Sequence, residues 1–326
     1  MITLAAFLNF NKRAFTRMRN LFYIFIVIVF FSACGDSYQE KKRLSRQERL
    51  KLMKEDSAAM KIAVTPTFDC LPLFVAKSSG LFERLGADIR LKHYNAQMDC
   101  DTELEKGRVE GAVTDLVRGE WMKIHGTSLV YVTSTNACWQ IISNFNSRIR
   151  RLKQLDDKMV AMARHAATDF MAWYAVDSAG LKPERVFRIQ INDVGLRLKM
   201  LVNNEMDAAV LPEPQASVAR MHRHGVLADT RKLGFSFGVI AFRSGVFDND
   251  RRKKQKDVFV RAYNMAVDSI NGKGIGHYKA LIHKYCNVDE SVVGKIPEDI
   301  KFRHISEPRT EDIARASAWI KENYKD

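Results

Sequence analysis

Ionisable side chains gather in the short segments that follow the predicted strands of this 326-residue chain. Carboxylates dominate these segments: Asp69, Asp99, Asp115, Asp193 and Glu213. A carboxylate accepts hydrogen bonds from an amine or an amino-substituted ring, and enclosing it without such a partner is costly. If two or three of these carboxylates face one crevice, the ligand should carry donor groups. The alternative for Asp115 is a structural role, in which its side chain only stabilises a turn.

A second group of candidates supplies aromatic, basic and neutral polar groups: Phe68, Cys70, Trp139, Gln140, Arg164, His165 and Thr168. Phe68 or Trp139 could cover the ring or apolar face of a ligand, although Trp139 could equally belong to the core. Arg164 and Thr168 partly fit an anion site at a helix N-terminus. Asp169 in the same turn opposes an anion, and Thr168 is also typical of a helix cap.

The segment TPTFDCLPLF places the first of these carboxylates. Proline lacks an N–H and disfavours helix in the residue before it, so a strand must end near Pro66. A helix can begin near Pro72, because proline suits the first helical turn. The loop between the two prolines is short, and its side chains point over the strand ends. We therefore predict that Asp69 accepts hydrogen bonds from a donor-rich ligand.

An enzymatic reading has less support. Cys70, His165 and Asp193 offer a thiol, an imidazole and a carboxylate, but they come from different predicted loops and no motif sets their geometry. The cysteines show no CxxC or Cys/His spacing that would indicate a metal site. We predict a binding protein that uses no cofactor and no metal.

These residues are positioned by alternating strands and helices from Lys61 onward, which predicts βαβ units. A second, similar set begins near Lys158, and the chain returns to the first set near Phe237. We predict an α/β protein of two lobes: 61–145 for lobe 1, 146–236 for lobe 2, and 237–326 for the return and the C-terminal helices. The crossings are expected near 144–148 and 232–237, with the ligand at the carboxyl ends of the strands.

The N-terminus predicts export. Basic residues precede an apolar run, Leu21–Ala33, that is too short for a comfortable membrane span of about 20 residues. Ser32 and Ala33 before Cys34 resemble a bacterial lipoprotein cleavage box, although Phe31 stands where leucine is usual. We predict a signal peptide over 1–33, a lipid (palmitate-type) anchor on Cys34 and a flexible tether over 34–60. An uncleaved N-terminal anchor is the alternative, and Met18 is a possible start.

The net charge of +14 falls to +10 after Cys34, because four basic residues and no acid precede it. Basic clusters occur at Ser147–Gln154 and Asp250–Asp257. Neither cluster has interleaved aromatic residues or a nucleic-acid motif. They indicate a solvated face or attraction to anionic lipid headgroups, and no nucleic-acid partner is expected.

The segment PLFVAKSSGLFERLGADIRL resembles the signature of type II periplasmic substrate-binding proteins, and more narrowly their thiamine-pyrimidine, taurine/alkanesulfonate and nitrate branch. The residues that match are Pro72, Ala76, Lys77, Gly80, Leu81, Phe82 and Gly86. EKGRVEGAVTD and NNEMDAAVLPEPQA are similar to two further segments of that family. The resemblance covers about Lys61 to Gly245. It implies a two-lobed, Venus-flytrap fold, each lobe a mainly parallel sheet flanked by helices.

The same resemblance implies a function. We expect a monomeric, membrane-tethered protein of the bacterial envelope that faces the periplasm. It would capture a small solute by hinge closure and pass it to an ABC permease and its ATPase. The specific expectation is a thiamine-type aminopyrimidine precursor bound at Asp69. A sulfonate or nitrate-type anion on Arg164, or a tethered sensor, are the alternatives.

In the sheet order of that family the first two strands are neighbours, so Cys70 and Cys100 should lie in adjacent loops. An exported protein permits a disulfide between them, and free thiols are the alternative.

Overall fold

The computed structural model describes residues 46–297 and 300–324. The predicted signal peptide, Cys34 and the start of the predicted tether lie outside these residues. The chain divides into one unit up to Ala58 and a second from Ala59 onward. In the first unit, α3 (Arg46–Ala58) is a polar helix that lies within the segment predicted as a tether. All other elements belong to the second unit.

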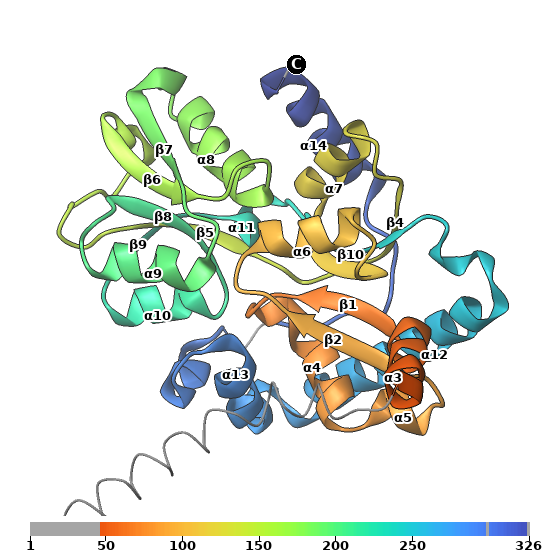
Figure 1. Cartoon of the computed structure of the whole chain (residues 1–326). Helices are drawn as coiled ribbons and strands as arrows, with labels where there is room; N and C mark the ends of the chain where they lie inside the picture. The colour runs from red at the N-terminus through yellow and green to blue at the C-terminus, as the bar shows by residue number, and fades with distance from the viewer. Residues whose placement is uncertain (1–45, 298–299, 325–326) are drawn as a thin grey trace, which may run out of the picture. The chain divides into compact units, whose positions relative to one another are not determined.

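The first lobe is built on a five-stranded sheet with the order β2-β1-β3-β10-β4 (Figure 1). Its strands are β1 (Met60–Val64), β2 (Ile89–His93), β3 (Gly111–Asp115), β4 (Leu129–Ser134) and β10 (Gly238–Arg243). β1 pairs in parallel with β2 and β3, and Met60 lies opposite Ile89. β10 runs antiparallel between β3 and β4.

The second lobe has the same plan, with the order β7-β6-β8-β5-β9. Its strands are β5 (Trp139–Ser143), β6 (Lys158–Met162), β7 (Val186–Gln190), β8 (Ala208–Pro212) and β9 (Gly225–Asp229). β6 pairs in parallel with β7 and β8, and β5 runs antiparallel between β8 and β9. The predicted α/β class is confirmed. Each sheet is mixed, because the strand that enters it from the other lobe, β10 in the first sheet and β5 in the second, runs antiparallel to both of its neighbours.

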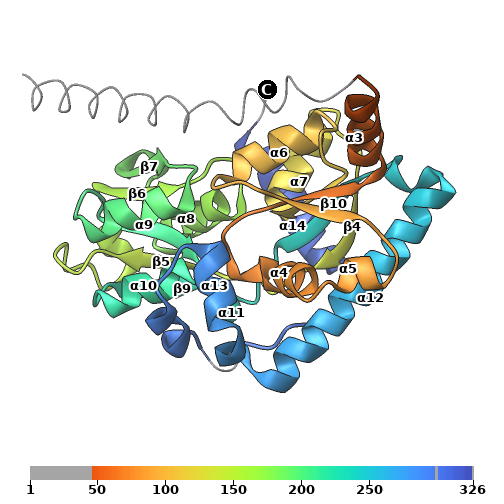
Figure 2. The ribbon, with the colours of Figure 1, turned by 60° about the horizontal axis from the view of Figure 1, so that its bottom comes forward.

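Helices flank both sheets. In the first lobe they are α4 (Leu71–Ser78), α5 (Leu81–Arg84), α6 (Gln97–Glu105) and α7 (Leu116–Ile124); in the second, α8 (Ala167–Ser178), α9 (Val194–Val202), α10 (Gln215–Met221) and α11 (Thr230–Leu233). The chain ends with α12 (Asp250–Lys273), α13 (Lys279–Cys286) and α14 (Thr310–Asn323). Short 3-10 helices are η1 (Phe68–Cys70), η2 (Leu152–Leu155), η3 (Pro183–Arg185), η4 (Val246–Asp248), η5 (Ile275–Tyr278) and η6 (Glu290–Lys295). Figure 2 shows α12 running beside α4 and α5.

Local chemistry explains the start of the first lobe. Pro72 lies in the first turn of α4, as the sequence predicts. The helical segment that starts there is divided into α4 and α5, because Gly80 adopts a left-handed conformation with φ of 63°. Buried aromatic side chains then join these helices to β10 and α12, including Phe74 and Phe259.

The first crossing between the lobes lies earlier than predicted. Residues 139–143 form β5 of the second sheet, where Trp139 lies opposite Pro212, so the chain crosses at 135–138 and not near 144–148. The reason is pairing: β5 finds antiparallel partners on both sides, which the local sequence does not reveal. The second crossing, expected near 232–237, lies between β9 and β10 and includes α11.

The C-terminal helix touches both lobes. α14 packs on α7 of the first lobe, and Trp319 of α14 contacts Phe170 and Trp173 of α8 in the second lobe. Within 46–297 and 300–324 no helix is both long enough and apolar enough to cross a membrane.

Candidate functional site

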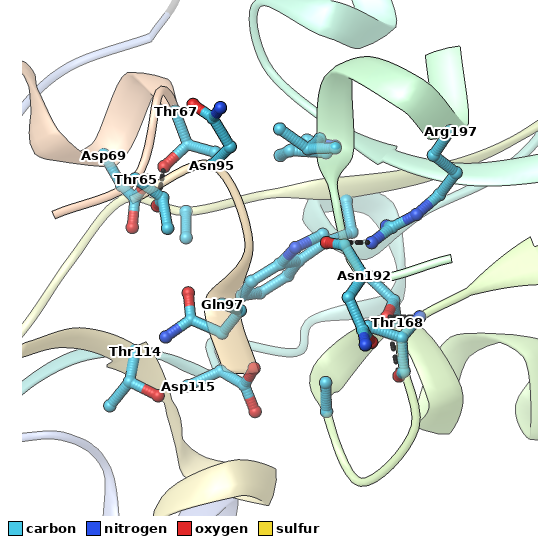
Figure 3. A pocket seen from close by; sticks show the side chains of 16 residues that line it. Thr65, Thr67, Asp69, Asn95, Gln97, Thr114, Asp115, Thr168, Asn192 and Arg197 are labelled. Carbon is cyan, nitrogen blue, oxygen red and sulfur yellow. Dashed lines mark hydrogen bonds between the residues drawn. The ribbon is translucent and has the colours of Figure 1, made fainter. Parts of the chain in front are cut away.

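A small cavity of about 60 Å³ lies where the two lobes face each other (Figure 3). Residues at or just after the carboxyl ends of β1, β2, β3, β6, β7 and β8 line it, together with the first crossing. Figure 3 shows Asp69, Gln97 and Asp115 of the first lobe on one side and Asn192 and Arg197 of the second lobe on the other. Such strand ends are the usual ligand position in open α/β sheets.

Asp69 comes from the loop between the two prolines. Asp69 lies on η1 and is 8% exposed. The Thr135 hydroxyl donates to its carboxylate at 3.4 Å. Burial raises the pKa of Asp69 above its ordinary value, and hydrogen bonds from Thr67 and Thr135 partly offset that rise. This carboxylate has spare acceptor capacity in an enclosed place, as a donor-bearing ligand requires.

Asp115 connects the two lobes. It caps α7 by accepting from the N–H of Arg118 at 2.9 Å. The same oxygen accepts from the N–H of Ala167, at the start of α8 in the second lobe, at 3.0 Å. Burial, which these bonds and Arg118 only partly offset, raises the pKa of Asp115 to about 6. A helix N-terminus of the kind that binds anions is thus already in contact with a carboxylate of the protein.

Arg197 faces these carboxylates from α9. The residue is 3% exposed, and its guanidinium donates to three backbone carbonyls: Ile191 at 3.0 Å, Val210 at 2.7 Å and Asn192 at 3.5 Å. Within the described residues no carboxylate forms an ion pair with it. Burial lowers the pKa of Arg197 to about 10, with Arg118 contributing, so it stays charged at neutral pH. Five N–H groups leave it donors for a ligand.

Further contacts hold the lobes together beside the cavity. The N–H of Phe68 donates to the carbonyl of Glu213 at 2.8 Å, and the side-chain amide of Gln215 donates to the carbonyl of Pro66 at 2.8 Å. The rings of Trp121 and His165 stack with centroids 3.8 Å apart. The structure therefore represents a closed arrangement of the lobes.

Four of the predicted site residues line the cavity: Asp69, Asp115, Trp139 and Thr168. Thr168 does not cap α8, since the cap position is Ala166. Its hydroxyl bonds instead to the backbone of Ala163, accepting from the N–H at 2.9 Å. Trp139 is half-buried and packs on both neighbouring cores.

The structure places four further candidates, Phe68, Cys70, Asp99 and Gln140, away from the cavity. Phe68 packs against Phe302, with ring centroids 5.4 Å apart. Cys70 is fully buried in the core, and Asp99 is exposed on α6. Gln140 lies in the second sheet, where its amide donates to Asp229 at 2.8 Å. None of these side chains lines the cavity.

The remaining candidates belong to the second lobe. Arg164 is exposed, and His165 stacks on Trp121. Asp193 caps α9 by accepting from the N–H of Leu196 at 2.8 Å. Glu213 is 2% exposed and is held by Ser217 and Arg220. These four also lie outside the residues that line the cavity.

Sequence reasoning missed Arg197, because it lies inside a helix and not in a strand-end loop. A signal was present: the buried residues of α9 are Val194, Arg197 and Leu201. An arginine in an apolar stripe at i, i+3 and i+7 is unusual and indicates a buried charge with a specific partner or role.

The cysteines carry no cross-link. Cys70, Cys100, Cys138 and Cys286 are all free and buried, so the two thiols considered for a disulfide are not joined. Burial raises the pKa of each thiol, which keeps it protonated and unreactive. Among the described residues, no group of three His, Cys, Asp or Glu side chains could hold a metal ion.

The sequence profile of the NMT1-like family matches residues 53–274, and no curated protein matches the chain significantly. Several solved structures share the fold. The periplasmic aliphatic sulphonate-binding protein SsuA from Escherichia coli has a TM-score of 0.68 at 17% identity, covering 81% of this chain and 92% of its own. The periplasmic nitrate-binding protein NrtA from Synechocystis PCC 6803 has a TM-score of 0.65 at 13% identity, covering 77% and 74%.

The desulfurization enzyme DSZB is also similar, with a TM-score of 0.60 at 12% identity, covering 81% of this chain and 92% of its own. The fold therefore occurs in binding proteins and in an enzyme. At these identities the likeness establishes the fold alone.

Proposed function

Because the chain belongs to the NMT1-like family, we propose that it is the solute-binding component of an ABC importer. Its partners would be a permease and an ATPase, and it would act as a monomer at the bacterial cell envelope, facing the periplasm. Two structural neighbours that are named as periplasmic solute-binding proteins support this role. A lipid on Cys34 would anchor it; loss of palmitate labelling in Cys34→Ala is the test.

The proposed solute is small and polar, with a donor-bearing edge such as an amine or an aminopyrimidine of the thiamine-precursor type. The observation that carries this choice is the pair of buried carboxylates, Asp69 and Asp115, in one cavity. Arg197 on the opposite wall would donate to an acceptor on the same solute. An aminopyrimidine has both kinds of edge, since its amine donates and its ring nitrogens accept.

A sulfonate or nitrate-type anion is the second candidate. Arg197, whose guanidinium has no carboxylate partner among the described residues, favours it, and the ligands named for SsuA and NrtA agree with it. The start of α8 argues against it, because the N–H of Ala167 already donates to Asp115. An anionic ligand at this helix start would face the carboxylates of Asp69 and Asp115. Arg164, the cation first considered for an anion, is exposed and outside the cavity.

An enzymatic role has less support than binding. Cys70 and Asp193 do not line the cavity, and His165 is stacked on Trp121, so the three groups form no nucleophile set. A tethered sensor that works without a permease would use the same cavity. Genes for a permease and an ATPase beside the gene of this protein would favour transport over sensing.

The deciding experiment replaces Asp69 by Asn and measures binding by calorimetry. The probes are the aminopyrimidine alcohol precursor of thiamine, taurine, methanesulfonate and nitrate, first ranked by thermal shift because a bound ligand raises apparent stability. For an amine-bearing probe we expect the variant to lose about tenfold or more in affinity, taking ~1.4 kcal/mol per decade. Asp99→Asn, on exposed α6, is the matched control and should bind as the parent does.

Two results would contradict the amine assignment. One is a thermal shift with the anions only. The other is tighter binding in Asp69→Asn, which would mean that its carboxylate repels the ligand. Either result would make Arg197 the central residue.

Ligand entry requires the lobes to move. The cavity of about 60 Å³ is narrow, so we expect the lobes to separate before a ring-bearing solute enters. We expect the crossings at 135–138 and 230–237 to act as a hinge. Small-angle scattering should then show a smaller radius of gyration once ligand is added. Identical scattering with and without a verified tight ligand would contradict hinge closure.

A further inference from the structure

An open trough of about 1050 Å³ lies on the second lobe and shares no residue with the cavity between the lobes. Its walls are the segment that follows β5 and the segment that enters β9, the edge strand of the second sheet. Three arginines line it, Arg148, Arg150 and Arg223, and none of the described residues that line it is acidic. The trough therefore concentrates positive charge.

This charge is not neutralised within the described chain. Arg148, Arg150 and Arg223 form no ion pair with any residue of 46–297 or 300–324. Other arginines of the same lobe are paired: Arg185 with Asp156 at 2.6 Å and Arg188 with Asp169 at 3.1 Å. Three unpaired guanidinium groups in one trough are suited to phosphate, which arginine binds with two parallel hydrogen bonds.

A phenylalanine is held in the open beside these arginines. Phe145 is 56% exposed, and its N–H donates to Nδ1 of His224 at 3.0 Å. The side chains on either side of it are also fixed: Asn144 donates to the carbonyl of Leu201 at 2.7 Å, and Asn146 to Asn204 at 2.8 Å. The exposure of Phe145 is thus imposed by the fold and does not come from a loose loop.

We propose that this trough docks on the surface of an anionic lipid bilayer. The three arginines bind lipid phosphates, and Phe145 enters the boundary between headgroups and acyl chains, as aromatic residues of interfacial proteins do. A cation near an anionic membrane contributes about a fivefold gain in partitioning. The trough alone is therefore a weak site, which becomes effective together with a second attachment to the same membrane.

A protein partner fits the trough less well. A stable protein interface buries roughly 800 Å² on each side and has an apolar core. Here the exposed large apolar side chains are only Phe145 and Val226, the latter 43% exposed. That area is too small for such a core, whereas one inserted ring and several phosphate contacts suffice for a bilayer.

The test uses the full chain in lipid nanodiscs, with a photoreactive benzoylphenylalanine in place of Phe145. We expect lipid adducts in phosphatidylglycerol discs and at least tenfold fewer in phosphatidylcholine discs. The same group in place of Phe187 is the matched control. Phe187 is 49% exposed on β7, at the opposite edge of the sheet, and it stands between the paired Arg185 and Arg188. Its adduct yield should be low in both lipids.

Charge reversal in Arg148→Glu/Arg150→Glu should lower the adduct yield at position 145 tenfold or more, with an unchanged melting temperature. High ionic strength should also lower the adduct yield at position 145 in the protein that keeps Arg148 and Arg150. This second measurement makes the test independent of how the charge-reversed variant folds. Equal yields at positions 145 and 187, equal yields in the two lipids, or adducts to a protein in cell membranes would overturn the proposal. Solute binding is a separate measurement, because none of these residues lines the cavity.

Discussion

Replacing Arg197 by Met is expected to lower the free energy of unfolding by about 3 kcal/mol, because three backbone carbonyls lose their charged donor inside the protein. For a chain of this size that loss corresponds to a fall in melting temperature of roughly 6–12 °C. Thermal unfolding followed by circular dichroism measures it. Methionine keeps a similar apolar stem, so a cavity contributes little.

Lys199→Met is the matched control for that change, because it removes a positive charge from the exposed side of the same helix. We expect it to stay within about 0.5 kcal/mol of the parent. An Arg197→Met protein as stable as the parent would mean that the guanidinium is not needed to hold the carbonyls. In that case its role lies with the ligand, and an anion becomes the favoured solute.

Replacing Asp115 by Asn is expected to stabilise the protein at neutral pH. The folded-state pKa of Asp115 is about 6, against an ordinary value of 3.8. A raised folded pKa means that the group favours folding below about pH 4 and that this contribution is lost as the pH rises through 6. Ionising the buried carboxyl therefore costs up to about 3 kcal/mol at pH 7 and above. Asparagine avoids that cost, and its side-chain oxygen can still accept from Arg118 and Ala167.

The expected signature is a pH-dependent difference between Asp115→Asn and the parent. The free energy of unfolding should be higher in the variant above pH 6, and the two proteins should converge near pH 4. Urea titrations across this range measure the difference. Asp99→Asn, on the surface of the same lobe, should show no such trend. A variant that is less stable at every pH would show that the carboxylate charge is what α7 and α8 require.

The two walls of the cavity carry opposite charges. Asp69 and Asp115 belong to the first lobe and Arg197 to the second, so closing the lobes brings both signs into a place of low polarity. Buried charges are tolerated only when they are paired or hydrogen-bonded. A solute with a donor edge and an acceptor edge would meet both walls, which gives closure a ligand-dependent stabilisation.

Much of the fold could be read along the chain. Alternating strands and helices predict the α/β class, and Pro66 and Pro72 place Asp69 over the strand ends. Asp115 directly follows the buried run of β3, which makes it a strand-end residue from its position alone. These features depend on local backbone chemistry and on burial patterns, both of which short stretches of sequence determine.

Other features exist only once distant segments meet. From the sequence, residues 139–143 could be the last strand of the first lobe or the first strand of the second. Their pairing with β8 and β9 places them in the second lobe. Glu213 reads as a cleft carboxylate, yet Ser217 and Arg220 of α10 hold it at the start of that helix. Arg197 reads as a helix residue, yet it reaches carbonyls of two other segments and lines the cavity. Strand partners and buried charge partners are chosen in three dimensions, because they depend on which groups folding brings within hydrogen-bond distance.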